Sequence, residues 1–218
     1  MKWENGVLEE RPQSRHEEVV NSALHSLGAI LALGGGYTLV HTAWENDNTL
    51  RLLCGLVFAG AMIIVYATSA FYHASERGPK KDHLQRIDRA AISLFFAGTY
   101  TPIALLMVRG WLGTLLCIGE WLLAFTGMVL MVQDPQSYPK RSTWLYQGMG
   151  WLTALGAGPL LRHAPATILT ALALGGLCYT IGILFLTRDR VKYFHAIFHV
   201  LAMLGTALQF WAISQYVG

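Results

Sequence analysis

Residues 50–73, LRLLCGLVFAGAMIIVYATSAFYH, decide the fold class of this chain. The run is apolar almost throughout, and its one Lys or Arg, Arg51, lies at its beginning. About 20 apolar residues in a helix cross the hydrocarbon core of a bilayer, which is roughly 30 Å thick. The run therefore predicts a membrane-spanning helix, and His73 closes it.

The same pattern recurs along the chain. Apolar runs occupy 19–41, 50–73, 88–108, 111–132, 144–161, 165–187 and 193–216. Short polar segments, such as 74–86, separate them and are predicted to be turns. Hydrophobic residues make up 54% of the chain and charged residues 13%, whereas about a quarter of an ordinary soluble domain is charged. We expect an all-α fold in which a cytoplasmic segment, 1–18, precedes one domain, 19–218, a seven-transmembrane helix bundle.

Two features of these runs qualify the prediction. The fifth run is the least regular, because Gly156, Gly158 and Pro159 interrupt its end. Segment 1–18 is polar and has no apolar stretch of the kind found in a signal peptide. We therefore expect the first span itself to direct insertion into the membrane.

The basic residues predict the orientation of the bundle. Of the 16 Lys and Arg, all but Arg51, Arg109 and Arg162 fall at one end of the predicted spans. Cytoplasmic loops carry the excess of Lys and Arg, so we expect a cytoplasmic N-terminus and an external C-terminus in the inner (plasma) membrane. The net charge of +3 is small and forms no basic face, so no nucleic-acid partner is expected. The sequence predicts no particular oligomeric state.

Ionisable residues within the spans gather at one predicted depth. His73 ends the second span, Asp88 begins the third, and His195 and His199 begin the seventh. The spacing of four residues stacks His195 and His199 on one helix face. Three neutral imidazoles with one open position are typical of a catalytic zinc site, and zinc is the default metal for such ligands. Ser69, one turn before His73, reaches the same layer, and Asp88 would orient a ligand or hold water.

Other interpretations of these residues stay open. Two histidines four residues apart are a weak signal alone, and the Ser69 hydroxyl could bond back to a carbonyl of its own helix. A second polar set, Glu17, Glu18, Asn21 and His25, begins the first span and could line or seal the same cavity. For Glu17 and His25 a structural role is the favoured interpretation, because an acidic residue also stabilises a helix N-terminus.

Four motifs resemble the hemolysin III family, which belongs with the progestin and adipoQ receptors. They are EEVVNSALHSLGA at 17–29, YATSAFYHAS at 66–75, QRIDRAAISLFFAGTYTPIAL at 85–105 and KYFHAIFHVLAMLG at 192–205. The resemblance covers the chain from Glu17 onward. It implies a seven-helix fold with a cytoplasmic N-terminus and zinc held by His73, His195 and His199.

The resemblance also bears on individual residues. It matches Ser69 to the serine of the family's SxxxH motif and Asp88 to an aspartate proposed to hold water at the zinc. The family's threonine and glycine around the first-span histidine are replaced by Leu24 and Ser26. That departure weakens any role carried over to His25.

The resemblance extends to alkaline ceramidases, which suggests metal-dependent hydrolysis of lipid amides. We therefore expect a zinc-dependent membrane protein of lipid homeostasis, with membrane lipids as substrate or ligand and hydrolysis of an amide or ester as its chemistry. Two alternatives remain: a receptor or sensor with a structural zinc, and a pore-forming hemolysin. The last ranks lowest, because a cytolysin must leave the cell.

Overall fold

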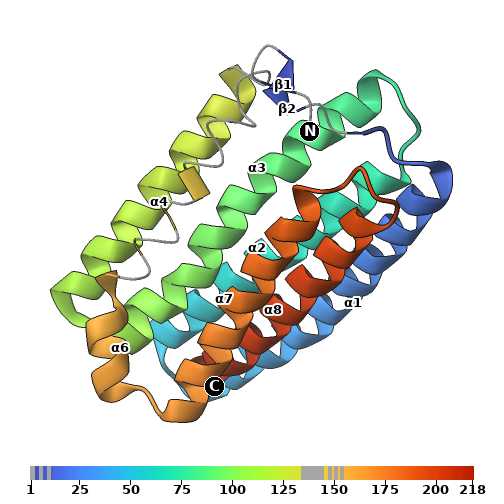
Figure 1. Cartoon of the computed structure of the whole chain (residues 1–218). Helices are drawn as coiled ribbons and strands as arrows, with labels where there is room; N and C mark the ends of the chain where they lie inside the picture. Colours follow the sequence, from blue (N-terminus) through green and yellow to red (C-terminus); the bar gives the residue numbers. More distant parts are fainter. Residues whose placement is uncertain are drawn as a thin grey trace.

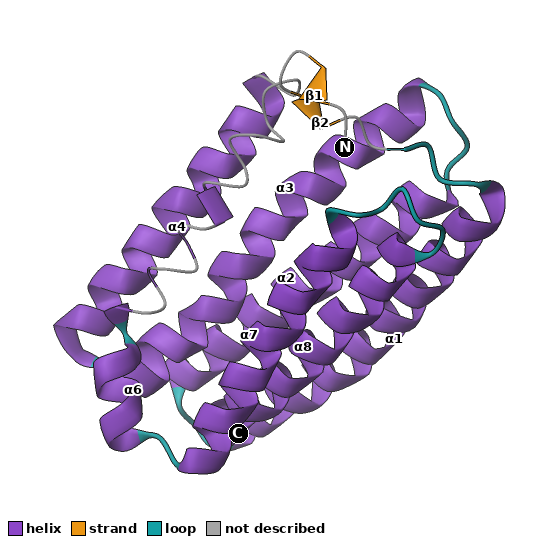
Figure 2. Ribbon diagram, viewed as in Figure 1, coloured by secondary structure: helices purple, strands orange, loops and turns teal. Residues whose placement is uncertain are grey.

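In the computed structural model, nearly all of the described chain is helical (Figures 1 and 2). The described residues are 3–4, 7–8, 11–133, 145–146, 149, 152 and 155–218. Their elements are β1 (Trp3–Glu4), β2 (Val7–Leu8), α1 (Arg15–Glu45), α2 (Thr49–Ala74), α3 (Pro79–Pro102), the π-helix η1 (Ile103–Val108), α4 (Gly110–Gln133), α6 (Ala157–His163), α7 (Ala166–Leu186) and α8 (Phe194–Val217). The two short strands pair antiparallel.

Six helices of the described chain are long and apolar enough to cross a membrane: α1, α2, α3 continued by η1, α4, α7 and α8. Large apolar side chains such as Ile30, Trp111 and Phe125 are exposed on their outer faces, which suits contact with lipid. Part of the predicted fifth span, 144–161, lies outside the described residues, and α6 is the element described at its end. The chain is thus a multi-pass membrane protein.

Local sequence explains where the helices begin. Ser14 caps α1 in a capping box with Glu17, and the Asn48 side chain caps α2. Pro79 occupies the first turn of α3, where its missing N–H costs nothing. Segment 74–86 was predicted to be a turn, but its second half is helical. That part of the prediction is wrong because helix-forming polar residues extend α3 beyond its apolar stretch.

Close contacts between small residues hold the helices together. A Cβ added to Gly28 would lie 2.6 Å from Tyr66 Cδ1, and one added to Gly98 would overlap the Cβ of Ala61. Lipid tails are as apolar as leucine, so close packing of small residues is a main source of helix association in membranes. The helix α1 packs along α2 and α8, α3 packs along α2 and α4, and α7 packs along α8.

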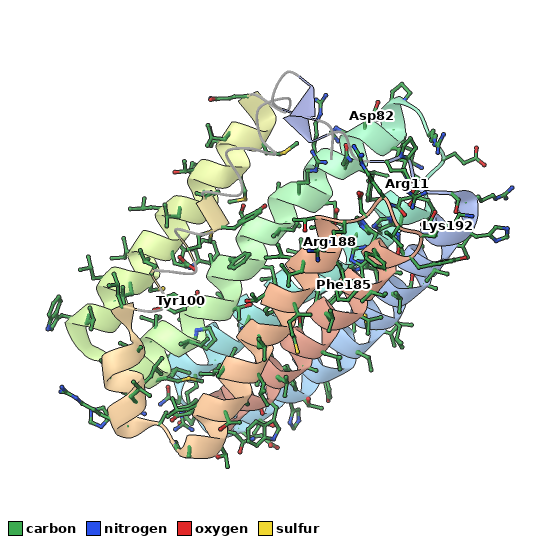
Figure 3. All side chains as sticks on the ribbon, in the orientation of Figure 1. Arg11, Asp82, Tyr100, Phe185, Arg188 and Lys192 are labelled. Atoms are coloured by element: carbon green, nitrogen blue, oxygen red, sulfur yellow. The ribbon has the colours of Figure 1, made fainter. Side chains whose placement is uncertain are left out.

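The helices α1 and α8 run side by side in the same direction (Figure 1). The helix α2 runs antiparallel to α1, so the beginning of α1, the end of α2 and the beginning of α8 lie at one end of the bundle. Arg11, Arg188 and Lys192 lie at this end, whereas Tyr100 lies toward the other (Figure 3). This end also carries the histidines discussed next.

Candidate metal centre

Four histidines from three helices meet at this end of the bundle. His25 comes from α1, His73 from α2, and His195 and His199 from the first turns of α8. The rings of His195 and His199 are 4.5 Å apart between centroids, which confirms that their spacing stacks them on one helix face. The ring of His199 is 4.1 Å from that of His25 and 5.1 Å from that of His73.

Three of the four rings form a buried trio whose nitrogens could hold one metal ion. His25, His73 and His199 each offer a nitrogen, and these nitrogens lie within 4.8 Å of one another. The Nε2 atoms of His73 and His199 are 3.2 Å apart. Two nitrogens that each bind zinc at about 2.1 Å can be no more than roughly 4.2 Å apart. The separation of His73 and His199 therefore already suits two ligands of one zinc.

Buried polar atoms without partners support the metal interpretation. Among the described residues, neither ring nitrogen of His25 nor Nδ1 of His195 has a hydrogen-bond partner, and both amide atoms of Asn21 lack one as well. A buried polar atom left unpaired costs about 1–3 kcal/mol. A cation that binds imidazole nitrogens would remove this cost from the histidines, so the donor set fits zinc.

The structure places the predicted ligands somewhat differently from the spacing argument. His73 and His199 belong both to the predicted set and to the buried trio. His195 contacts both of them, with its ring 5.4 Å from that of His73, but it is not in the trio. His25, expected to be structural, takes that place. A sequence pattern shows which histidines share a depth but not which way a helix is turned about its axis.

Glu18, a member of the predicted polar set at the start of the first span, contacts the trio directly. The Glu18 carboxylate lies 2.7 Å from Nδ1 of His73 and 2.9 Å from Nζ of Lys81. Its spacing agrees with the predicted polar set, because Glu18 lies three residues before Asn21 and seven before His25, on the same face of α1.

The neighbouring carboxylate, Glu17, has a different task. Its side chain is almost fully buried, forms an ion pair with Arg11 and accepts hydrogen bonds from Ser14. It also accepts from the backbone N–H of Tyr193 at 3.0 Å. Tyr193 has a left-handed conformation, with φ of 64°, immediately before α8. Glu17 therefore fixes the start of α8, the helix that carries His195 and His199.

A cavity of about 280 Å³ lies beside the histidines. Glu18, His73, His195 and Lys81 are among the residues that line it, and Arg11 and Arg77 lie at its polar wall. The hydrogen bonds that Arg11 donates to Glu17 raise the pKa of the Arg11 guanidinium above its ordinary value, so the Arg11 side chain at this wall of the cavity is positively charged. The cavity gives small polar molecules room next to the buried trio.

Comparison with known proteins identifies the family. The family described as haemolysin-III related matches residues 13–210. The chain belongs to this family. It is 32% identical over 202 residues to "Hemolysin-3" of Bacillus cereus, covering 92% of each chain. It is 30% identical over 200 residues to "Hemolysin-3 homolog" of Bacillus subtilis (strain 168), covering 92% of this chain and 94% of the relative.

A human protein belongs to the same set of relatives. The chain is 25% identical over 210 residues to "Monocyte to macrophage differentiation factor" of Homo sapiens, covering 93% of this chain and 85% of the relative. The resemblance to the hemolysin III family and to the progestin and adipoQ receptors is thus confirmed.

Two further residues carried over from the haemolysin-III motifs lie on neighbouring helices. Ser69 is buried on α2, one turn before His73. Asp88 is partly buried on α3 and interacts with other parts of the structure. Their roles toward a metal or a substrate stay predictions.

Proposed function

We propose that this haemolysin-III related protein binds zinc at its histidine cluster and acts in membrane lipid homeostasis by hydrolysing an amide or ester bond of a lipid. The proposal includes an inner (plasma) membrane location with the N-terminus in the cytoplasm, because the basic side chains Arg11, Arg188 and Lys192 gather at the end that carries the cluster. The zinc ligands would be His73 and His199 together with His25 or His195.

One observation carries the proposal. Three buried imidazoles from α1, α2 and α8 converge within 4.8 Å, and both nitrogens of His25 lack partners among the described residues. Ionisable groups inside a membrane protein are costly and usually functional. A buried histidine trio in which both ring nitrogens of His25 lack partners among the described residues is best explained by a metal ion.

The chemistry would be divided between the metal and the side chains around it. Bound zinc acts as a Lewis acid that polarises a carbonyl and makes water a nucleophile near neutral pH. The Asp88 carboxylate would accept a proton from the attacking water, and the Ser69 hydroxyl would orient the scissile group. Proton transfer by a positioned carboxylate contributes typically 10²–10⁴-fold to rate.

The surroundings of the cluster favour a lipid substrate. The outer faces of the helices carry exposed apolar side chains such as Val19, Leu27 and Phe71 near the same end of the bundle. A lipid in the adjoining leaflet would place its polar headgroup region close to the depth of the cluster. The cavity of about 280 Å³ would admit the polar part of the molecule and water.

Metal analysis of the detergent-purified protein tests the first step. We expect about one zinc per chain in wild type and loss of zinc in His73→Ala and His199→Ala. His25→Ala and His195→Ala then show which of the two residues is the third ligand, because only loss of the true ligand should lower the zinc content as much as His73→Ala or His199→Ala does. His41→Ala is the control, since His41 is half exposed and pairs with Glu45 away from the cluster. Wild type prepared without chelators and still free of metal would refute the proposal.

A second candidate function, a receptor or sensor with structural zinc, is favoured by one observation: the cluster joins the first two helices, α1 and α2, to the last, α8. Asp88→Asn separates the two. A hydrolase should lose turnover of ceramide or phospholipid in liposomes while keeping zinc and thermal stability. Turnover that persists in Asp88→Asn would count against the catalytic role, and absence of turnover in zinc-loaded wild type would favour the receptor.

A further inference from the structure

His73 differs from the other histidines of the cluster in having an anionic partner. Its Nδ1 lies 2.7 Å from Glu18 Oε2, while its Nε2 lies 3.2 Å from Nε2 of His199. An ionised carboxylate can only accept hydrogen bonds, so Nδ1 of His73 must carry the proton. In the neutral ring, the lone pair of Nε2 then faces Nε2 of His199.

Lys81 in turn fixes Glu18. Its ammonium group lies 2.9 Å from Glu18 Oε1 and donates at 3.1 Å to the carbonyl oxygens of Tyr72 and Ser75 at the end of α2. A lysine has three N–H donors, and all three are accounted for by these contacts. Lys81 therefore ties α1, α2 and α3 together at the carboxylate that holds His73.

We infer that Glu18 is a positioning residue of the metal centre and that Lys81 holds it in place. Glu18 selects one tautomer of His73 and orients its ring before any metal arrives. Partners of this kind beyond the ligands themselves raise ligand basicity, and their removal costs 10–100-fold in metal affinity. The inference rests on the proposed function, because it takes the cluster to be a metal site.

Other roles for Glu18 fit the contacts less well. As an ordinary surface ion pair it would be exposed, but only 17% of its side chain is exposed and that of His73 is 2% exposed. As a further metal ligand it would have to leave His73, which has no other hydrogen-bond partner at Nδ1 among the described contacts. Glu18 also lines the cavity, together with His73 and His195.

The test uses the full-length protein in detergent with ¹⁵N-labelled histidine and NMR of the metal-free form. Wild type should show His73 protonated at Nδ1 and unprotonated at Nε2, with the resonance assigned by its loss in His73→Ala. Glu18→Ala should abolish this tautomer preference, whereas Glu18→Gln, which keeps an oxygen acceptor, should largely restore it. Glu45→Ala is the matched control, because Glu45 pairs with the exposed His41, with Nδ1 of His41 3.5 Å from Oε2 of Glu45.

Zinc affinity, measured by chelator competition, provides the second readout. Glu18→Ala should weaken zinc binding 10–100-fold, with a smaller loss in Glu18→Gln and none in Glu45→Ala. If Glu18→Ala does not fold, Lys81→Met tests the same link, and it should weaken zinc binding and broaden the His73 signal. An unchanged tautomer or an unchanged zinc affinity in Glu18→Ala, or an unchanged zinc affinity in Lys81→Met, overturns the inference.

The two readouts separate this inference from the proposed function. Wild type that binds no zinc would refute the metal proposal, yet the tautomer of His73 would still show whether Glu18 positions it. Wild type that binds zinc with the same affinity as Glu18→Ala would spare the metal proposal and refute the positioning role.

Discussion

Replacing Glu17 by alanine should destabilise the protein more than any exposed charge substitution. The change removes the ion pair with Arg11 and leaves the Tyr193 N–H without its acceptor. Breaking a buried ion pair by removing one partner costs 3–5 kcal/mol. Because the Arg11 side chain is 27% exposed, water can partly solvate it, and we expect the lower value, about 3 kcal/mol.

This loss can be measured by thermal unfolding in detergent, followed by tryptophan fluorescence. At 2–4 °C per kcal/mol for a chain of this size, the midpoint should fall by roughly 6–12 °C. Glu45→Ala, which removes an exposed glutamate from the far end of the same helix, should change stability by no more than about 0.5 kcal/mol. Equal shifts in the two variants would refute the idea that Glu17 fastens the start of α8. Zinc affinity should fall with Glu17→Ala as well, since His195 and His199 lie in the first two turns of α8, which begins immediately after Tyr193.

Two further predictions concern the interior of the bundle. Gly98→Ala should destabilise the protein by about 1–3 kcal/mol, because its new Cβ would overlap Ala61. Gly34→Ala is the control and should be neutral or slightly stabilising, because nothing lies within 4 Å of the added Cβ. Thermal unfolding compares the two variants, and equal midpoints would contradict the packing argument. Glu120 is buried within α4, and its Oε2 has no hydrogen-bond partner among the described residues. The neutral variant Glu120→Gln should therefore match or exceed the stability of wild type, whereas Glu120→Lys should prevent accumulation of the protein in the membrane. A Glu120→Gln variant several kcal/mol less stable than wild type would indicate that Glu120 has a cationic partner.

The length and composition of the apolar runs predicted most of the fold. Run 19–41 corresponds to α1 at Arg15–Glu45, and run 193–216 to α8 at Phe194–Val217. The main differences lie at the ends, where a capping box at Ser14 lengthens α1 and polar residues extend α3 from Pro79. Hydropathy cannot detect these extensions, because the residues in them lie outside the hydrocarbon core of the bilayer and are helical through capping and helix propensity. The π-helix η1 also had no signal in the apolar pattern.

The candidate site was only partly predictable. The predicted depth in the membrane and the i,i+4 spacing placed His73, His195 and His199 in one predicted site, because both depend only on the position of a residue along its helix. The place of His25 in the trio and the contact of Glu18 with His73 depend on how α1 is rotated about its axis. That rotation is set by close packing, such as Gly28 against Tyr66, which no single sequence reveals.

The origin of the trio in the first, second and last helices has a consequence for biosynthesis. The helix α2 ends at Ala74 and α8 at Val217, and at about 5–20 residues per second the ribosome takes roughly 7–30 s to synthesise the chain between them. During that interval His25 and His73 lie in an incomplete bundle without His199. The trio is therefore complete only after the final helix has been inserted, and a chain truncated before α8 would enter the membrane without His199.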